Sequence, residues 1–178
     1  MNQSNVNEED LKYSLYHLFV LNKNIDNCLY SLHDLERSNL KEVNRESEII
    51  IFSATIFFCV IRTCAYLDEI NYKFLKEKYN NKLTQELEKI IGEINSSWPD
   101  LKEFRNEILA HNFRIRNQGY KSIFESKGYA AYQVPADLNE MQKLFDKIGL
   151  ITTILDNYFP QYFEEFRKGS LPTNRNEV

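Results

Sequence analysis

The residues that could do chemistry gather in one short stretch, "FRNEILAHN", residues 104–112, which holds Arg105, Asn106 and His111. A histidine titrates near neutral pH, so it can accept or donate a proton during a reaction. An arginine is permanently charged, and its planar fork matches the oxygens of a phosphate. These residue types predict acid–base chemistry at a phosphodiester, in which each well-placed acid or base is worth about 10² to 10⁴ in rate.

The spacing of these residues limits what one chain can do alone. On a helix that turns about 100° per residue, Arg105 and His111 flank the apolar side and lie about 120° apart, so they cannot easily share a ligand. A second copy of the helix packed across a two-fold axis would bring two histidines and two arginines into one cleft. That set suits RNA cleavage without a metal or cofactor, leaving a 2′,3′-cyclic phosphate. The apolar side is predicted to consist of Leu101, Phe104, Ile108 and Ile115.

The elements that must position this stretch are predicted to be helices. Glycine and proline are scarce, at 5 and 4 of 178 residues, and 43% of the chain is hydrophobic. Apolar residues recur every three or four positions over residues 8–38 and again over 138–159, which is the period of a helix with one buried side. We therefore expect an all-α fold, an antiparallel bundle of four to five helices that forms a two-fold homodimer through the motif helix. Residues 8–168 are expected to form one domain between disordered ends, 1–7 and 169–178.

Charge and hydropathy restrict the compartment and the partners. The apolar run at residues 49–61 is thirteen residues long, short of the roughly twenty that span a bilayer, so we expect a buried helix and no membrane partner. The first ten residues lack a signal-peptide pattern, and the three cysteines have no CxxC spacing, which favours reduced core thiols and a cytoplasmic location. The net charge of −4 gives no general basic field, so no DNA partner is expected.

A local basic surplus remains around the motif. Between residues 100 and 121 there are five basic and three acidic residues, and the connection at 117–135 is long and rich in aromatic residues. Aromatic rings beside basic groups can stack on unpaired bases, although a loop aromatic more often covers the core. The candidate RNA-binding residues are Arg114, Arg116, Lys121 and Tyr120.

Several local features carry expectations that a structure can test. At "NSSWPD", Ser97 is expected to cap a new helix with Asp100 as its reciprocal acid. Asp137 is expected to cap the last long helix in the same way. Arg62 follows a strongly apolar run, so it should reach water or pair with an acid such as Asp68 or Glu69.

The stretch "RNEILAH", residues 105–111, resembles the R-x(4–6)-H motif of the HEPN superfamily. Asn106 takes the place of the polar residue that typically follows the arginine, and Ala110 is the small residue before the histidine. The likeness extends to an apolar second helix, entry through a Trp-Pro turn and a last helix after "VPADL". The chain is more similar to the abortive-infection-like branch than to the short toxins.

This resemblance implies a helical homodimer whose paired motifs form a metal-independent endoribonuclease site, in phage defence, toxin–antitoxin systems or RNA processing. It would make His111 the acid or base, Arg105 the phosphate-binding group and Asn106 a helper, with RNA as substrate and an antitoxin protein as a further partner. Phe113 stands where toxins with a nucleotidyltransferase antitoxin often have tyrosine. The alternative is a non-catalytic HEPN-like module that binds a nucleotide, RNA or protein and dimerises.

Overall fold

The protein is described here from a computed structural model, which describes residues 8–37, 45–76, 79–106, 114–115, 119–120, 132–135 and 137–169. For 45–53 and the two strand segments it describes the backbone alone. The described parts contain six α-helices: α1 (Glu8–Arg37), α2 (Arg45–Ile70), α3 (Asn81–Ser97), α4 (Leu101–Phe104), α5 (Leu138–Tyr158) and α6 (Pro160–Arg167). The expectation of an all-helical fold is confirmed, with six helices, two of them short, where four to five were expected.

Three short elements accompany the helices. A π-helical turn, η1 (Asn71–Lys76), extends α2, and two-residue strands β1 (Arg114–Ile115) and β2 (Gly119–Tyr120) pair in antiparallel fashion. Ile115 was expected on the motif helix, and that prediction is wrong because the residue lies in β1. The predicted disordered ends lie outside the described residues, except for Gly169, which lies two residues after the end of α6 in a left-handed conformation at φ 80°.

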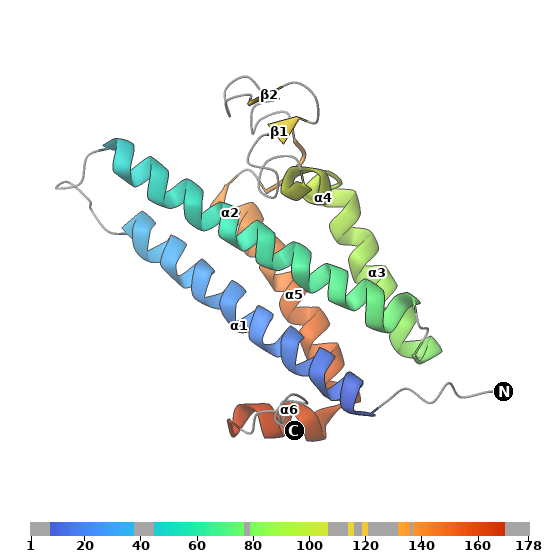
Figure 1. Ribbon diagram of the computed structural model, residues 1–178. Coiled ribbons are helices and arrows are strands. Elements are labelled where there is room, and N and C mark those ends of the chain that lie inside the picture. The colour runs from blue at the N-terminus through green and yellow to red at the C-terminus, as the bar shows by residue number, and fades with distance from the viewer. Residues whose placement is uncertain are drawn as a thin grey trace.

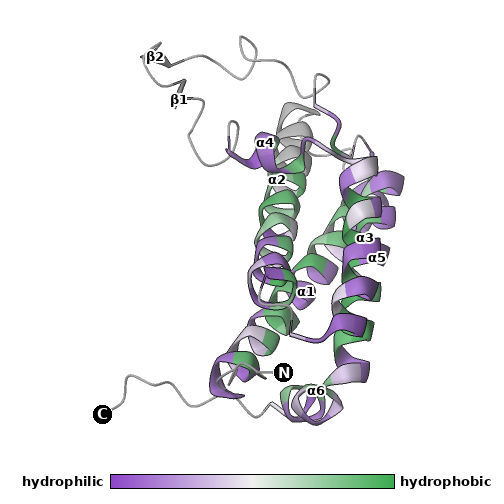
Figure 2. Cartoon of the chain, turned by 90° about the vertical axis from the view of Figure 1, so that its right-hand side faces the viewer, coloured by the Kyte–Doolittle hydropathy of each residue, from purple (hydrophilic) through white to green (hydrophobic). Residues whose placement is uncertain are grey.

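The long helices form the body of the bundle (Figure 1). Helices α1 and α2 run antiparallel side by side, and α5 packs against α1 and α3. Helix α4 lies at the end of the molecule opposite α6. Figure 2 shows hydrophobic residues along much of α2, while α5 alternates between hydrophilic and hydrophobic sides. None of the described helices is long and apolar enough to cross a membrane.

Periodic burial explains why these segments are helices. The predicted stripe on α1 is buried at Leu11, Leu15, Leu18, Ile25 and Leu32. The stripe on α5 is buried at Met141, Phe145, Ile148 and Leu155, and α3 buries its own set at the expected spacing. All three cysteines are free and buried, as expected for core thiols. Each helix contributes one apolar side to a common core, which holds the bundle together.

The start of α5 follows the predicted cap. The Asp137 carboxylate accepts a hydrogen bond from the Glu140 backbone N–H at 2.8 Å. This bond satisfies one of the backbone donors that the first turn of a helix leaves unpaired. The start of α5 is therefore set by a local sequence signal.

Candidate functional site

Helix α4 leads directly into the motif and is held by apolar packing. Leu101 and Phe104 are buried, as the helical wheel predicted for them. The Phe104 ring lies 5.8 Å from the ring of Phe57 on α2 and 5.5 Å from that of Tyr132, which precedes α5. The motif residues that follow therefore begin from a fixed point on the bundle.

The turn before α4 is built differently from the prediction. Helix α3 continues through Ser97, and Asp100 stands at the start of α4 without a side-chain capping bond. The Asp100 carboxylate instead accepts the backbone N–H of Gln133 at 2.8 Å, and its own N–H donates to the Gln133 carbonyl at 3.4 Å. The predicted cap at Ser97 and Asp100 is therefore wrong, because Asp100 binds a segment 33 residues later.

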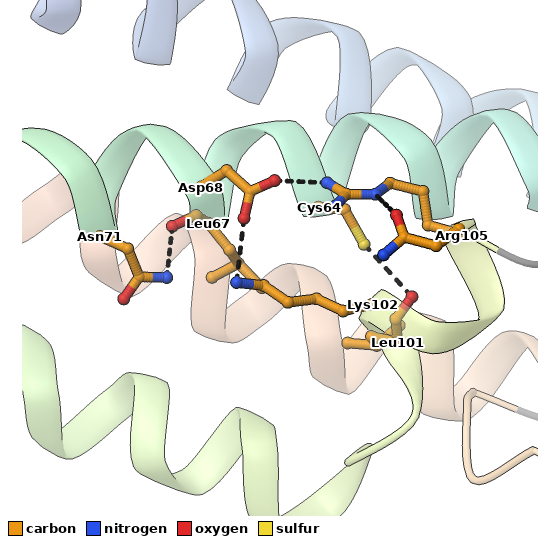
Figure 3. A network of polar contacts seen from close by, with 8 residues as sticks. Cys64, Leu67, Asp68, Asn71, Leu101, Lys102 and Arg105 are labelled. Carbon is orange, nitrogen blue, oxygen red and sulfur yellow. Dashed lines mark hydrogen bonds and ion pairs between the residues drawn. The ribbon is translucent and has the colours of Figure 1, made fainter. Parts of the chain in front are cut away.

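Arg105 follows α4 and turns back toward α2 (Figure 3). Its Nη1 donates a hydrogen bond to Oδ2 of Asp68, and its Nε donates to Oδ1 of Asn106 at 3.1 Å. Only 24% of the Arg105 side chain is exposed. Contacts on two sides fix the plane of the guanidinium, so Arg105 is an oriented cation rather than a freely moving surface side chain.

Asp68 joins two cations of the α4 segment to α2. Its Oδ1 lies 3.0 Å from Nζ of Lys102, while Oδ2 accepts the bond from Arg105, so each carboxylate oxygen has one cationic partner (Figure 3). Burial alone would raise the pKa of Asp68, but the hydrogen bonds from Arg105 and Lys102 outweigh it and lower the pKa below its ordinary value of 3.8. Asp68 is therefore negatively charged at neutral pH. We call Asp68, Lys102, Arg105 and Asn106 the charged cluster.

The same ion pair acts on the arginine. The hydrogen bond to Asp68 raises the pKa of Arg105 above its ordinary value. The cluster then carries two positive charges and one negative charge, a net charge of +1 at neutral pH. A small net positive charge in a partly exposed place is compatible with binding a single phosphate.

Cys64 lies beside the charged cluster, on the turn of α2 before Asp68. Its thiol donates a weak hydrogen bond to the Leu101 carbonyl at 3.5 Å. Burial raises the pKa of the Cys64 thiol to about 11. Cys64 is therefore a neutral packing residue that helps hold α4 against α2.

Asn106 is exposed beside the Arg105 guanidinium, and its side-chain oxygen accepts the hydrogen bond from Arg105 Nε. Asn106, which the motif predicts to assist catalysis, therefore contacts Arg105 directly.

The other predicted site residues are described in part or not at all. His111 lies outside the described residues, as do Arg116 and Lys121. Arg114 and Tyr120 are described in their backbone, where they are paired partners in the β1–β2 ladder. The structure therefore brings Arg105 and Asn106 together, and it pairs two of the four candidate RNA-binding residues.

Sequence reasoning missed the role of Asp68. It was expected as a partner of Arg62, six residues away along the same helix, but its described partners are Lys102 of α4 and Arg105 directly after α4. The Arg62 guanidinium instead lies over the Phe58 ring, 4.7 Å from its centroid, and Glu69 lies 3.8 Å from His17. Of the two expected alternatives, pairing of Arg62 with either acid is wrong, while contact with water is compatible with its half-buried side chain, whose Nε is buried.

Two surface hollows lie elsewhere on the described part of the protein. One of about 350 Å³ lies between α1 and Glu69, and one of about 550 Å³ lies between the end of α3 and α5. Neither is lined by a member of the charged cluster. Among the described residues, no group of three or more His, Cys, Asp or Glu side chains is arranged to hold a metal ion. The charged cluster is therefore the best candidate site that these residues offer.

Comparison with family models, with curated proteins and with solved structures finds no match to this chain.

Proposed function

We propose that the protein is a metal-independent endoribonuclease of the HEPN type that acts as a homodimer. His111 and Arg105 of both protomers form the catalytic site, and Asn106 assists them. The observation that carries the proposal is the orientation of Arg105. Its guanidinium is held by Asp68 on one side and by Asn106 on the other, at the start of the motif.

The reaction follows from the chemistry of these groups. The 2′-oxygen of a ribose attacks the adjacent phosphorus while one imidazole accepts the 2′-hydroxyl proton. The bond from phosphorus to the 5′-oxygen breaks, and the second imidazole donates a proton to that oxygen. The products are a 2′,3′-cyclic phosphate and a 5′-hydroxyl. The Arg105 guanidinium binds the phosphate oxygens as negative charge builds on them.

RNA binding beside the site is assigned to the segment after the motif. The backbones of Arg114 and Tyr120 pair in the β1–β2 ladder, which supports placing both residues in one RNA-binding segment. Arg116 and Lys121 belong to the same segment of the sequence. A toxin–antitoxin or phage-defence setting, with an antitoxin protein as a further partner, belongs to this proposal.

A second candidate function is a non-catalytic dimeric module that binds a nucleotide, RNA or a protein. The observation that favours it is the engagement of Arg105 by Asp68, since an ion-paired and mostly covered guanidinium can serve as a structural tie. Growth of the expression host separates the two candidates. A nuclease should slow growth and His111→Ala should relieve it, whereas a binding module should be harmless in both forms.

The direct test is incubation of purified protein with mixed RNA in EDTA, followed by identification of the product ends. The wild type should give fragments with cyclic-phosphate ends, and His111→Ala should give none. His33→Ala is the matched control, because His33 lies on α1 and contacts Gln142 of α5. Cleavage that survives in His111→Ala, or is lost equally in His33→Ala, contradicts the proposal.

A further inference from the structure

Asp68 is the one member of the charged cluster that lies outside the motif and its helix. It extends from α2, whereas Lys102 and Arg105 are one helical turn apart on the α4 segment (Figure 3). A single carboxylate thus holds two cations of a neighbouring element, one on each oxygen. Such an arrangement brings the two cations together on one side of α2.

The ion pairs are not what attaches α4 to the bundle. Leu101 and Phe104 are buried, and the aromatic rings of Phe57 and Tyr132 pack on Phe104. Apolar burial of this kind stabilises a segment more than exposed ion pairs do. Packing of Leu101 and Phe104 attaches α4 to the bundle. The Asp68 ion pairs are therefore not needed for that attachment and can serve ligand binding.

The three charged side chains differ in exposure in a way that fits phosphate binding. The exposed fraction of the side chain is 57% for Lys102 and 41% for Asp68, against 24% for Arg105. Lys102 can therefore turn its ammonium to an arriving phosphate while Arg105 stays in place. A preoriented guanidinium and a more exposed ammonium together give a phosphate one fixed and one adaptable partner.

We propose that Asp68 is a positioning residue for the phosphate-binding pair of Arg105 and Lys102, and that Lys102 is a second cation for the same phosphate. This inference rests on the proposed function. It assigns roles to two residues that the motif does not contain. Asp68 acts through its two cations, and Lys102 binds the substrate.

Asp68→Asn is the informative variant because it keeps the shape of the side chain and removes the charge. Two effects of opposite direction follow from it. The guanidinium loses its ionic anchor, so kcat should fall about 10- to 100-fold. The two cations lose their counter-charge, so binding of RNA should become about threefold tighter at low salt. A merely structural aspartate would lower stability and change neither quantity in this pattern.

The matched control is Asp156→Asn. Asp156 also pairs with an arginine, Arg167, but this pair joins α5 to α6, at the end of the molecule away from α4. The control should leave kcat and RNA affinity unchanged. Melting temperatures of both variants show that they are folded, and Asp68→Glu should restore part of the lost kcat.

The experiment combines three measurements on the full chain. Cleavage of a short RNA in EDTA gives kcat and KM, and fluorescence anisotropy with a 2′-O-methyl RNA, which cannot be cleaved by this route, gives affinity. The ¹⁵N-edited NMR signal of the Arg105 Nε–H, assigned by its loss in Arg105→Lys, reports the order of the guanidinium. We expect Asp68→Asn to weaken this signal, to lower kcat and to tighten binding, and we expect Lys102→Ala to weaken binding.

The outcomes separate this inference from the proposed function. If the wild type cuts RNA and Asp68→Asn has a kcat within about twofold of it, the positioning role is overturned. If the wild type does not cut RNA, the proposed function fails, and the NMR signal and the anisotropy decide the inference. In that case an unchanged Arg105 signal or an unchanged RNA affinity in Asp68→Asn overturns the inference. A lost Arg105 signal together with tighter RNA binding supports it.

Discussion

Tyr66 and Asp68 are two residues apart on α2 and serve opposite sides of it. Tyr66 is fully buried, and its hydroxyl lies 2.8 Å from the Thr152 hydroxyl on α5, which in turn donates to the Asn22 side chain on α1 at 3.2 Å. Asp68, about 200° further around the helix, is partly exposed and binds Lys102 and Arg105 of the α4 segment.

The difference between the two regions follows from burial. Tyr66, Thr152 and Asn22 of the inner network are neutral side chains, and burial raises the pKa of Tyr66. The network reaches a carboxylate only at its half-buried edge, where Asn22 donates to Asp26 at 3.2 Å. The charges of the outer cluster lie where water still reaches them. A neutral network fixes how three helices fit together, whereas a charged cluster at the surface can exchange one of its partners for a ligand. We therefore assign stability to the inner side of this part of α2 and function to the outer side.

The largest expected effect is on stability, at the residue that attaches α4. Phe104→Ala removes a fully buried ring that packs against Phe57 and Tyr132, and should lower the free energy of unfolding by about 3 to 5 kcal/mol. Denaturant unfolding measures this change. Phe104→Leu should cost much less, and a loss below about 1 kcal/mol in Phe104→Ala would mean that α4 is not attached by packing.

The next effect is on activity alone. Arg105→Ala should lower kcat for RNA cleavage about 100-fold or more, because the oriented guanidinium is lost. The same variant should change the melting temperature little, since packing holds α4. Steady-state kinetics and thermal unfolding of one protein sample measure both. A large loss of stability with unchanged kcat would contradict the assignment of function to the outer side of α2, because it would make Arg105 a structural residue.

A smaller effect is expected on the inner side. Tyr66→Phe should lower the free energy of unfolding by about 1 to 2 kcal/mol, because the half-buried Thr152 hydroxyl loses its hydrogen bond with the buried tyrosine. RNA cleavage should not change. Tyr158→Phe is the matched control, since the Tyr158 hydroxyl makes a longer contact of 3.5 Å to Glu86 and should cost less. Equal losses of unfolding free energy in the two variants would contradict the claim that the Tyr66 hydrogen bond stabilises the protein more than the longer Tyr158 contact does.

The smallest effect is the pH dependence of Asp68. Its pKa is lower in the folded protein than in the unfolded chain, so its ion pairs stabilise the fold above the ordinary value of 3.8. This stabilisation is lost as pH falls through that value toward the lower folded pKa. Because the pairs are partly exposed, the contribution is about 0.5 kcal/mol. The difference in unfolding free energy between wild type and Asp68→Asn should therefore shrink on acidification, and a difference that grows instead would contradict the cited shift.

Periodicity was enough to predict the long helices and their buried sides. Leu11, Leu15 and Leu18 repeat at the helical spacing, and the Asp137 cap depends on a backbone group three residues away. Such features are local, so the sequence carries them directly. The segments α1, α3 and α5 were predictable for this reason.

Long-range pairing was not predictable by the same reasoning. Asp100 resembles a capping residue but binds Gln133, and Asp68 lies near Arg62 in the sequence but pairs with Arg105, 37 residues later. These partners are set by how α2, α4 and the segment before α5 pack together. Of the candidate site, the sequence could identify Arg105 and Asn106 by their types, while the residue that orients Arg105 required the fold.

The most direct test of the account compares Arg105→Ala, His111→Ala and the double variant in one RNA cleavage assay in EDTA. Groups that act together on one phosphodiester are not additive, so the double variant should be no slower than the slower single variant. Each single variant should lose about 100-fold or more. Wild-type cleavage rates in either single variant, or losses that multiply in the double variant, would contradict a shared catalytic site.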